Sequence, residues 1–221
     1  MLRHKGNKIG FRDYRKALVP ANRCARTGEK PPSHDTLCTR HPAATERYVS
    51  IPDWQLVTEH TDISDSIMLD WLSGTGSLTR RLMAAGNDDF RVEVLLEQQQ
   101  PARADEAASL GLPEAHPVWV REVLLHTAGA PRVFARTVAD LQAFNAAGVH
   151  LENLGSRSLG ELLFNDPRIR REPLEISRYP AKWLPADRQQ PGCWARRSLF
   201  ASERLQLLVC EVFLPGWPPA A

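Results

Sequence analysis

Two charged residues lie in the middle of segments that otherwise have the composition of buried β-strands. The segment RLQLLVCEVFLPGW (204–217) places Glu211 among apolar residues, and both faces of this segment are mostly apolar. The segment PVWVREVLLH (117–126) places Arg121 on a face with Trp119 and other large apolar residues. A buried charge is costly unless it is hydrogen-bonded, paired with an opposite charge or kept for chemistry. These two residues are therefore the first candidates for a functional site.

The strand patterns allow two interpretations of these charges. In the first, Arg121 pairs with Glu211, or with its neighbour Glu122, in a buried structural ion pair that contributes little net stability. In the second, Arg121 binds a ligand carboxylate through two hydrogen bonds, and Glu211 meets a hydroxyl group or a proton in a closed apolar pocket. Alternation of apolar and charged residues does not by itself separate the two.

The surrounding segments predict an α+β fold, a single domain with a mainly antiparallel sheet covered by helices. Two short helices are expected within residues 64–86, the second capped by Ser77 and ended by Gly86. A further short helix is expected at 157–164. Strands are expected at 91–97, in a hairpin over 116–140 with the turn TAGAP, and near 173–179, 193–200 and 205–214. Because most strands follow one another without a helix between each pair, the sheet is expected to be antiparallel.

Composition and charge restrict the function classes. The chain has 221 residues, 43% hydrophobic and 24% charged, as is typical of one soluble globular domain with a substantial core. The net charge of +2 gives no reason to expect nucleic acid or an anionic membrane as a partner. Four scattered cysteines favour a reducing compartment, and no apolar run reaches the roughly 18 residues of a membrane span. We therefore expect a cytoplasmic protein.

Residues 1–55 differ in composition from the rest of the chain. They are polar and broken by Pro and Gly, without a sustained helical or strand period, and we interpret them as a flexible extension ahead of a domain at 56–221. Four residues of metal-ligating types occur there: Cys24, His34, Cys38 and His41. They lack the close pairs of ligands that zinc sites use, so no metal is expected.

Sequence motifs point to one family. The common motifs of nucleotide-binding enzymes, serine hydrolases and zinc proteases are missing. Instead, six short blocks together resemble the chorismate pyruvate-lyase family, whose members form 4-hydroxybenzoate from chorismate for ubiquinone synthesis. The resemblance covers about residues 64 to 217. The blocks are, in chain order, MLDWL with SLTRRL (68–82), WVREVLL (119–125), ARTV (135–138), LGSRSLGELLF (154–164), WARRS (194–198) and CEVFLP (210–215).

The resemblance implies a role for four residues and requires no cofactor. Arg121 is implied to bind the ring carboxylate, and Glu211 to face the ring hydroxyl. Backbone N–H groups at Leu78 and Leu159 are implied to reach the carboxylate as well. The family can carry Met at the position of Leu78, and because the implied contact comes from the backbone, we expect this departure to affect packing more than binding.

Other residues near these blocks could take part. Arg136 in ARTV could point into the same pocket and meet the pyruvyl carboxylate. Arg196 and Arg197 could help with that second carboxylate, but adjacent strand residues face opposite ways, so at most one of them faces the pocket. Cys210 is expected to face away from the pocket as a buried thiol.

A rival class has the same fold. The pocket domain also resembles the effector-binding domain of certain bacterial transcription regulators, which sense small molecules without catalysis. Those regulators carry a winged helix before the pocket domain, and residues 1–60 show no such helical periodicity. A structural or scaffold protein would leave both buried charges unexplained. We therefore favour the lyase.

Overall fold

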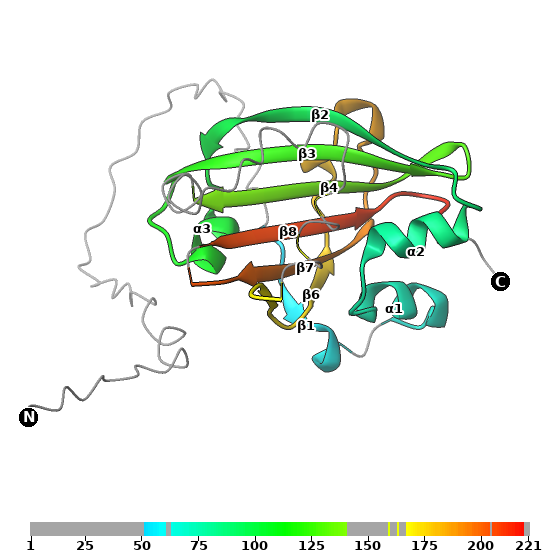
Figure 1. The fold of residues 1–221 in the computed structure, drawn as a ribbon, viewed down its shortest axis with the longest axis horizontal. Helices are drawn as coiled ribbons and strands as arrows, with labels where there is room; N and C mark the ends of the chain where they lie inside the picture. The colour runs from blue at the N-terminus through cyan, green and yellow to red at the C-terminus, as the bar shows by residue number, and fades with distance from the viewer. Residues whose placement is uncertain are drawn as a thin grey trace, which may run out of the picture. The chain divides into compact units, whose positions relative to one another are not determined.

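The computed structural model describes residues 51–60, 63–140, 159, 163, 167–203 and 205–218. Its strands are β1 (Gln55–Leu56), β2 (Phe90–Pro101), β3 (Pro117–Thr127), β4 (Ala130–Asp140), β5 (Arg170–Arg171), β6 (Glu175–Arg178), β7 (Trp194–Ala201) and β8 (Gln206–Phe213). Within the described residues they form one antiparallel sheet in the order β1-β6-β7-β8-β4-β3-β2, and β5 pairs with β7 outside this path (Figure 1). The antiparallel α+β fold predicted from the sequence is thus confirmed.

Three α-helices accompany the sheet in this part of the chain: α1 (Ser66–Ser73), α2 (Leu78–Ala85) and α3 (Ala104–Leu110). Short 3-10 turns lie at η2 (Val57–Glu59), η4 (Ala181–Trp183) and η5 (Ala186–Arg188). The Ser77 hydroxyl accepts a hydrogen bond from the Arg80 N–H at 3.4 Å, and Gly86 ends α2, as the sequence predicts. None of the described helices combines the length and the apolar composition needed to cross a bilayer.

Alternation along the strands gives the sheet two differently covered faces. The face that carries Arg121, called the cavity face below, packs against α1 and α2, which lie together toward one end of the sheet in Figure 1. The face that carries Glu122, called the network face, packs against α3. The core residues on the cavity face include Trp71, Leu72, Leu78, Leu82, Val123 and Leu125; those on the network face include Ala107, Leu110, Val118, Val120 and Val138.

The β3–β4 hairpin contains a bulge that decides which β4 residues share the cavity face. The turn pairs Thr127 with Ala130, but the register shifts by one residue between Leu125 and His126. An extra residue in one strand of an antiparallel pair moves all later residues to the other face. As a result, Arg121 lies opposite Thr137.

A second bulge occurs where β2 pairs with β3. The register shifts between Val94 and Leu96, and Glu97 comes to lie opposite Arg121. Residues that lie opposite each other in antiparallel strands have neighbouring side chains on one face. Arg121 is therefore flanked on the cavity face by the carboxylate of Glu97 and the hydroxyl of Thr137.

Gly86 lies where α2 meets the end of β3. The Thr127 hydroxyl donates a hydrogen bond to the Leu82 carbonyl at 2.9 Å, which fastens the helix to the strand. A Cβ atom at Gly86 would lie 1.8 Å from that hydroxyl oxygen and 3.1 Å from the Ala128 nitrogen. Only a glycine allows so close an approach of the two elements.

Several predicted segments fall partly or wholly outside the described residues. Residues 1–50, with the four metal-ligating residue types, and most of the helix predicted at 157–164 are among them; Leu159 and Leu163 are described and helical. Residues 51–55, assigned to the extension on sequence, are described. The Trp54 Nε1–H donates to Asp105 Oδ2 at 2.9 Å, so this residue packs with α3.

Candidate active site

A small cavity lies on the cavity face and is lined by both of the charged residues singled out above. Its volume is ≈ 50 Å³, little more than the share of one or two water molecules in the liquid. The described residues that line it are Thr79, Val92, Arg121, Val123, Leu125, Ala135, Thr137, Leu159, Leu163, Phe200, Val209 and Glu211. A ligand the size of an aromatic ring therefore requires these walls to move apart.

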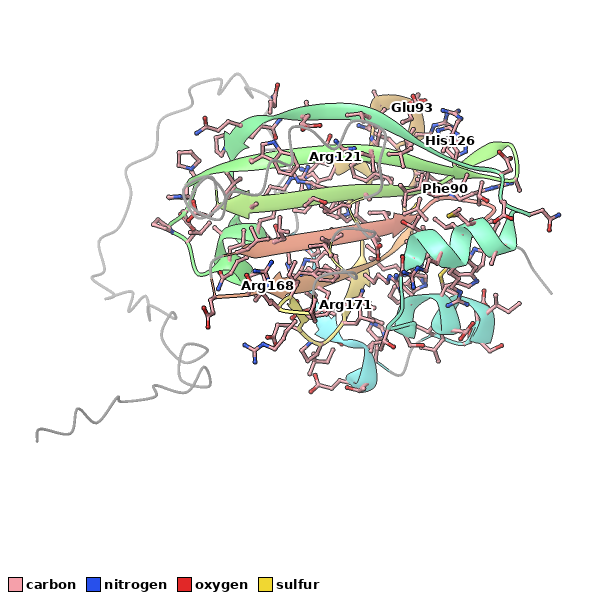
Figure 2. The ribbon with its side chains drawn as sticks, in the orientation of Figure 1. Phe90, Glu93, Arg121, His126, Arg168 and Arg171 are labelled. Carbon is pink, nitrogen blue, oxygen red and sulfur yellow. The ribbon has the colours of Figure 1, made fainter. Side chains whose placement is uncertain are left out.

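Arg121 extends from the middle of β3 and is buried (Figure 2). Its Nη1–H donates to Glu97 Oε2 on β2 at 2.6 Å. The sequence left open an ion pair with Glu211 or with Glu122, but within the described part of the chain the carboxylate paired with Arg121 is that of Glu97. The β2 bulge places Glu97 opposite Arg121. The alternation of residues along β2 does not predict this bulge, so the sequence did not indicate Glu97 as the partner.

Glu211 is paired with an arginine from the neighbouring strand. Arg196 on β7 lies opposite Glu211 on β8, and its Nε–H donates to Glu211 Oε2 at 2.6 Å. The Nη1–H groups of Arg196 donate to the carbonyls of Trp71 and Gly74, both at 2.8 Å. Arg196, only 1% exposed, thus fixes the Glu211 carboxylate and ties it to the turn between α1 and α2.

Arg121 and Glu211 stand at separate positions along the cavity. Arg121 pairs in register with Thr137 on β4, Thr137 pairs with Val209 on β8, and Glu211 follows two residues later on the same face. Neighbouring strands are about 4.8 Å apart, so β3 and β8 are separated by about 10 Å. An anion-binding group and a carboxylate thus face an apolar floor at a separation comparable to the length of one substituted ring, and the walls above this floor have to move apart before a ring can enter.

The two backbone positions implied by the family lie beside this cavity. Leu78 is the first residue of α2, and the next residue, Thr79, lines the cavity. The first turn of a helix presents backbone N–H groups without intrahelical partners. Leu159 lines the cavity directly and packs against the core cluster that contains Leu163.

Arg136 does not lie in the cavity, and the expectation that it could meet a ligand there is wrong. It shares the network face with Glu122, because the β4 bulge pairs these two residues. Arg136 Nε–H and Nη2–H donate to the two carboxylate oxygens of Glu106 at 2.6 and 3.1 Å. Its Nη1–H donates to Glu122 Oε1 at 2.7 Å. An unbroken hairpin would pair Arg121 with Arg136 and place both on one face.

Charge and burial act against each other in this network. Burial by itself raises the pKa of the Glu106 carboxyl, but the hydrogen bonds and charge of Arg136, with Arg103, outweigh burial and lower this pKa below its ordinary value. Burial likewise opposes the charge of Arg136, and its two carboxylate partners outweigh burial and raise the pKa of the guanidinium. The network is therefore charged at neutral pH and is a structural feature of the network face.

The other arginine pair and the cysteine lie as the alternation predicts. Arg196 faces the cavity side with Glu211, whereas Arg197 faces the network side, where its Nε–H donates to Glu175 at 2.8 Å. Cys210 is buried on the network side, and burial raises the pKa of its thiol. Cys210 therefore has no place in the chemistry of the cavity.

Arg171 is a residue near the site that the sequence did not single out. It lies in the two-residue strand β5, where no periodic pattern distinguishes it from a solvated arginine (Figure 2). Its Nη1–H donates to the Thr75 carbonyl at 2.9 Å, and its guanidinium lies 5.2 Å from the centre of the Phe200 ring, which lines the cavity.

The described residues contain no cluster of side chains suited to a metal ion.

A larger, more open hollow lies elsewhere on the surface, with a volume of ≈ 600 Å³. Arg178 and Trp194 form part of it, with the guanidinium 3.7 Å from the indole ring centre. Neither Arg121 nor Glu211 lines it. Because it is more open to solvent and contains neither of the two buried charges, it is a weaker candidate than the small cavity.

Comparisons with known proteins find relatives of similar sequence and solved structures of low sequence identity. A family model described as chorismate lyase matches residues 50–219. The chain is 46% identical over 169 residues to a probable chorismate pyruvate-lyase 2 of Pseudomonas fluorescens, covering 76% of this chain and 92% of that protein. It is 51% identical over 161 residues to a probable chorismate pyruvate-lyase of Pseudomonas putida, covering 73% and 86%. Among solved structures, the effector domain of PhnF from Mycobacterium smegmatis is 17% identical with a TM-score of 0.45, covering 65% of this chain and 91% of that chain.

Proposed function

The chain belongs to the chorismate lyase family, and we propose that it is a chorismate pyruvate-lyase, which converts chorismate into 4-hydroxybenzoate and pyruvate. The observation that carries the proposal is the cavity in which Arg121 and Glu211 face an apolar floor about two strand spacings apart. The ring carboxylate and the ring hydroxyl of the product lie at opposite ends of one ring, as these two groups do along the cavity.

The reaction is an elimination that needs no redox partner. Ring carbon 4 loses its proton, the bond from ring carbon 3 to the ether oxygen breaks, and the ring becomes aromatic. The departing enolpyruvate takes up a proton on its methylene carbon and becomes pyruvate. Because aromatisation supplies much of the driving force, the protein has to hold the ring, exclude water and accept one proton.

The described residues divide these tasks. Arg121, held by Glu97, binds the ring carboxylate through its guanidinium and stabilises negative charge on the ring as the proton leaves. Glu211, held by Arg196, accepts a hydrogen bond from the ring hydroxyl and takes the proton of carbon 4 directly or through a relay. The apolar side chains of Val123, Val209 and their neighbours exclude water.

The test is an assay of the purified protein with chorismate, which follows 4-hydroxybenzoate by absorbance and pyruvate by a coupled dehydrogenase. Glu211→Gln is expected to lower kcat by about 10²–10⁴-fold, the range for a positioned acid or base. Arg121→Met is expected to raise KM by about 10–100-fold, as loss of charge-assisted hydrogen bonds does. The exposed Glu114→Gln serves as the matched control and should keep wild-type constants.

Two results would contradict the proposal. Wild-type turnover in Glu211→Gln would remove that carboxylate from the reaction. Tight binding of 4-hydroxybenzoate by the wild type without any turnover of chorismate would identify a sensor of the same fold instead.

The setting of the enzyme is part of the proposal. Cys193 and Cys210, the described cysteines, are buried free thiols, which supports a reducing compartment such as the cytoplasm. We take the protein to act as a monomer, to be checked by size-exclusion chromatography with light scattering. A deletion strain that loses ubiquinone and regains it on added 4-hydroxybenzoate would place the product on the route to ubiquinone.

A further inference from the structure

Two arginines from different strands meet at the turn between α1 and α2. Arg196 Nη1–H donates to the Gly74 carbonyl at 2.8 Å, and Arg171 Nη1–H donates to the Thr75 carbonyl at 2.9 Å. Consecutive Cα atoms are only 3.8 Å apart. The two guanidinium groups thus bind successive carbonyls of one turn, and they are near enough to interact electrostatically.

Glu211 belongs to the same group of charges. It is bonded to Arg196 at 2.6 Å. Among the described residues, Glu211 and Arg196 both act electrostatically on Arg171. The guanidinium of Arg171 also lies over the ring of Phe200, a wall of the cavity. Arg171 and Arg196 therefore stand at the end of the cavity that holds Glu211, away from Arg121.

The charges of this cluster favour an anion. Its two guanidinium groups carry two positive charges and its carboxylate one negative charge. Burial lowers the pKa of Arg171 to about 10, with Glu211 opposing the shift and Arg196 adding to it. A poorly hydrated guanidinium gains more from a bound carboxylate than a fully hydrated one does, because less water has to be displaced.

Resting on the proposed function, we propose that Arg171, backed by Arg196, binds the enolpyruvyl carboxylate of chorismate. Chorismate carries two carboxylates, one on the ring and one on the enolpyruvyl ether. The ether is attached to ring carbon 3, next to carbon 4, whose hydroxyl faces Glu211. With the ring carboxylate on Arg121, the second carboxylate lies on the Glu211 side of the cavity, where Arg171 stands.

This subsite distinguishes substrate from product. Chorismate engages both Arg121 and Arg171, whereas 4-hydroxybenzoate has a single carboxylate and engages Arg121 only. As the bond at ring carbon 3 breaks, the ether oxygen takes the electron pair, and the neighbouring guanidinium stabilises the enolate before the methylene carbon is protonated. After pyruvate leaves, the 4-hydroxybenzoate that remains in the site has no carboxylate bound to Arg171.

The experiment compares substrate and product in one variant. Arg171→Met keeps an unbranched apolar stem but removes the guanidinium, and with it the positive charge that lies over Phe200. We expect kcat/KM for chorismate to fall about 10–100-fold, while the Kd of 4-hydroxybenzoate, measured by calorimetry, stays within about twofold. Arg121→Met should weaken both ligands. Arg170→Met, the exposed neighbour on the same strand, is the matched control and should change neither.

Arg171→Lys keeps the positive charge without the planar fork of the guanidinium. It is expected to raise the KM of chorismate several-fold with the Kd of 4-hydroxybenzoate unchanged. This variant replaces Arg171→Met in the comparison if the methionine variant does not reach the wild-type melting temperature. Equal weakening of substrate and product would show that Arg171 only supports the cavity wall, and unchanged constants for chorismate would remove it from the site; either result overturns the inference.

Direct binding of chorismate separates this inference from the proposed function. If the wild type binds chorismate without converting it, the lyase assignment fails, but the subsite stands when Arg171→Met weakens chorismate and spares 4-hydroxybenzoate. If the wild type converts chorismate and Arg171→Met keeps the wild-type kcat/KM, the subsite alone fails. If the wild type does not bind chorismate, both fail.

Discussion

Replacing Arg136 with methionine tests whether this arginine is structural, as the network face indicates, or binds a ligand, as its place in ARTV first suggested. The change removes three hydrogen bonds and leaves the carboxylates of Glu106 and Glu122 without their main cation. Both side chains of the Arg136–Glu106 pair are nearly inaccessible, at 3% and 6% exposure, so solvent screens this pair little.

The magnitude follows from the contacts that remain. Breaking a buried ion pair by removing one partner costs about 3–5 kcal/mol of unfolding free energy. Arg103 stays within 3.9 Å of both Glu106 and Glu122 and compensates in part. We therefore expect the lower end, about 3 kcal/mol, which corresponds to a fall in Tm of about 6–12 °C for a chain of this size.

Thermal unfolding followed by circular dichroism and urea unfolding at pH 7 measure this loss, and calorimetry with 4-hydroxybenzoate measures binding in the same preparation. The Kd of 4-hydroxybenzoate and the KM of chorismate should stay near the wild-type values below the melting range. A cycle with Glu106→Gln should give a coupling energy of about 0.5–3 kcal/mol, as for residues in one network. An Arg136→Met protein of unchanged stability whose KM for chorismate rises tenfold would refute the structural role.

Two further predictions concern stability. Because the pKa of Glu106 is lowered in the fold, its ionised form stabilises the protein fully above its ordinary pKa of 4.5, and this contribution is lost as the pH falls through the lowered value; Glu106→Gln should therefore lose less stability than the wild type in urea titrations from pH 5 to pH 3. Gly86→Ala should cost about 1–3 kcal/mol, as overpacking does, because the new Cβ meets the Thr127 hydroxyl at 1.8 Å. Gly76→Ala, whose Cβ meets nothing within 4 Å, is the control. Equal melting temperatures for the two alanine variants would contradict the packing argument.

The sequence predicted those features that depend on local patterns. The Ser77 cap, the helix end at Gly86 and the strands on either side of the β3–β4 turn were foreseen, because capping residues, glycine and alternating apolar positions act within a few residues of themselves. The alternation of apolar residues along the two strands was also enough to single out Arg121 and Glu211 as buried charges and candidate site residues. Each of these features is set by neighbours in the chain.

The ion-pair partners could not be predicted, since they depend on how distant strands are aligned. Glu97 meets Arg121 only because β2 contains a bulge, and Arg136 leaves the cavity face only because β4 contains one. Arg171 belongs to a strand of two residues, too short to carry a period. Alternation shows which residues of one strand share a face. The register between strands decides which residues of the neighbouring strand lie beside them on that face.

The two bulges beside β3 determine which mutations this hairpin can tolerate. Without them, regular pairing would set Arg121 between Leu96 and Arg136, an apolar side chain on one side and a like charge on the other. A substitution in β4 alters one side chain, but loss of a single codon between the turn and Arg136 would exchange the two faces of the rest of the strand. The guanidinium of Arg136 would then lie on the cavity face, and Thr137 would take its place beside the carboxylates of the network face. We therefore expect natural variants of this gene to differ often in which residues occupy this part of the hairpin and rarely in how many residues it contains.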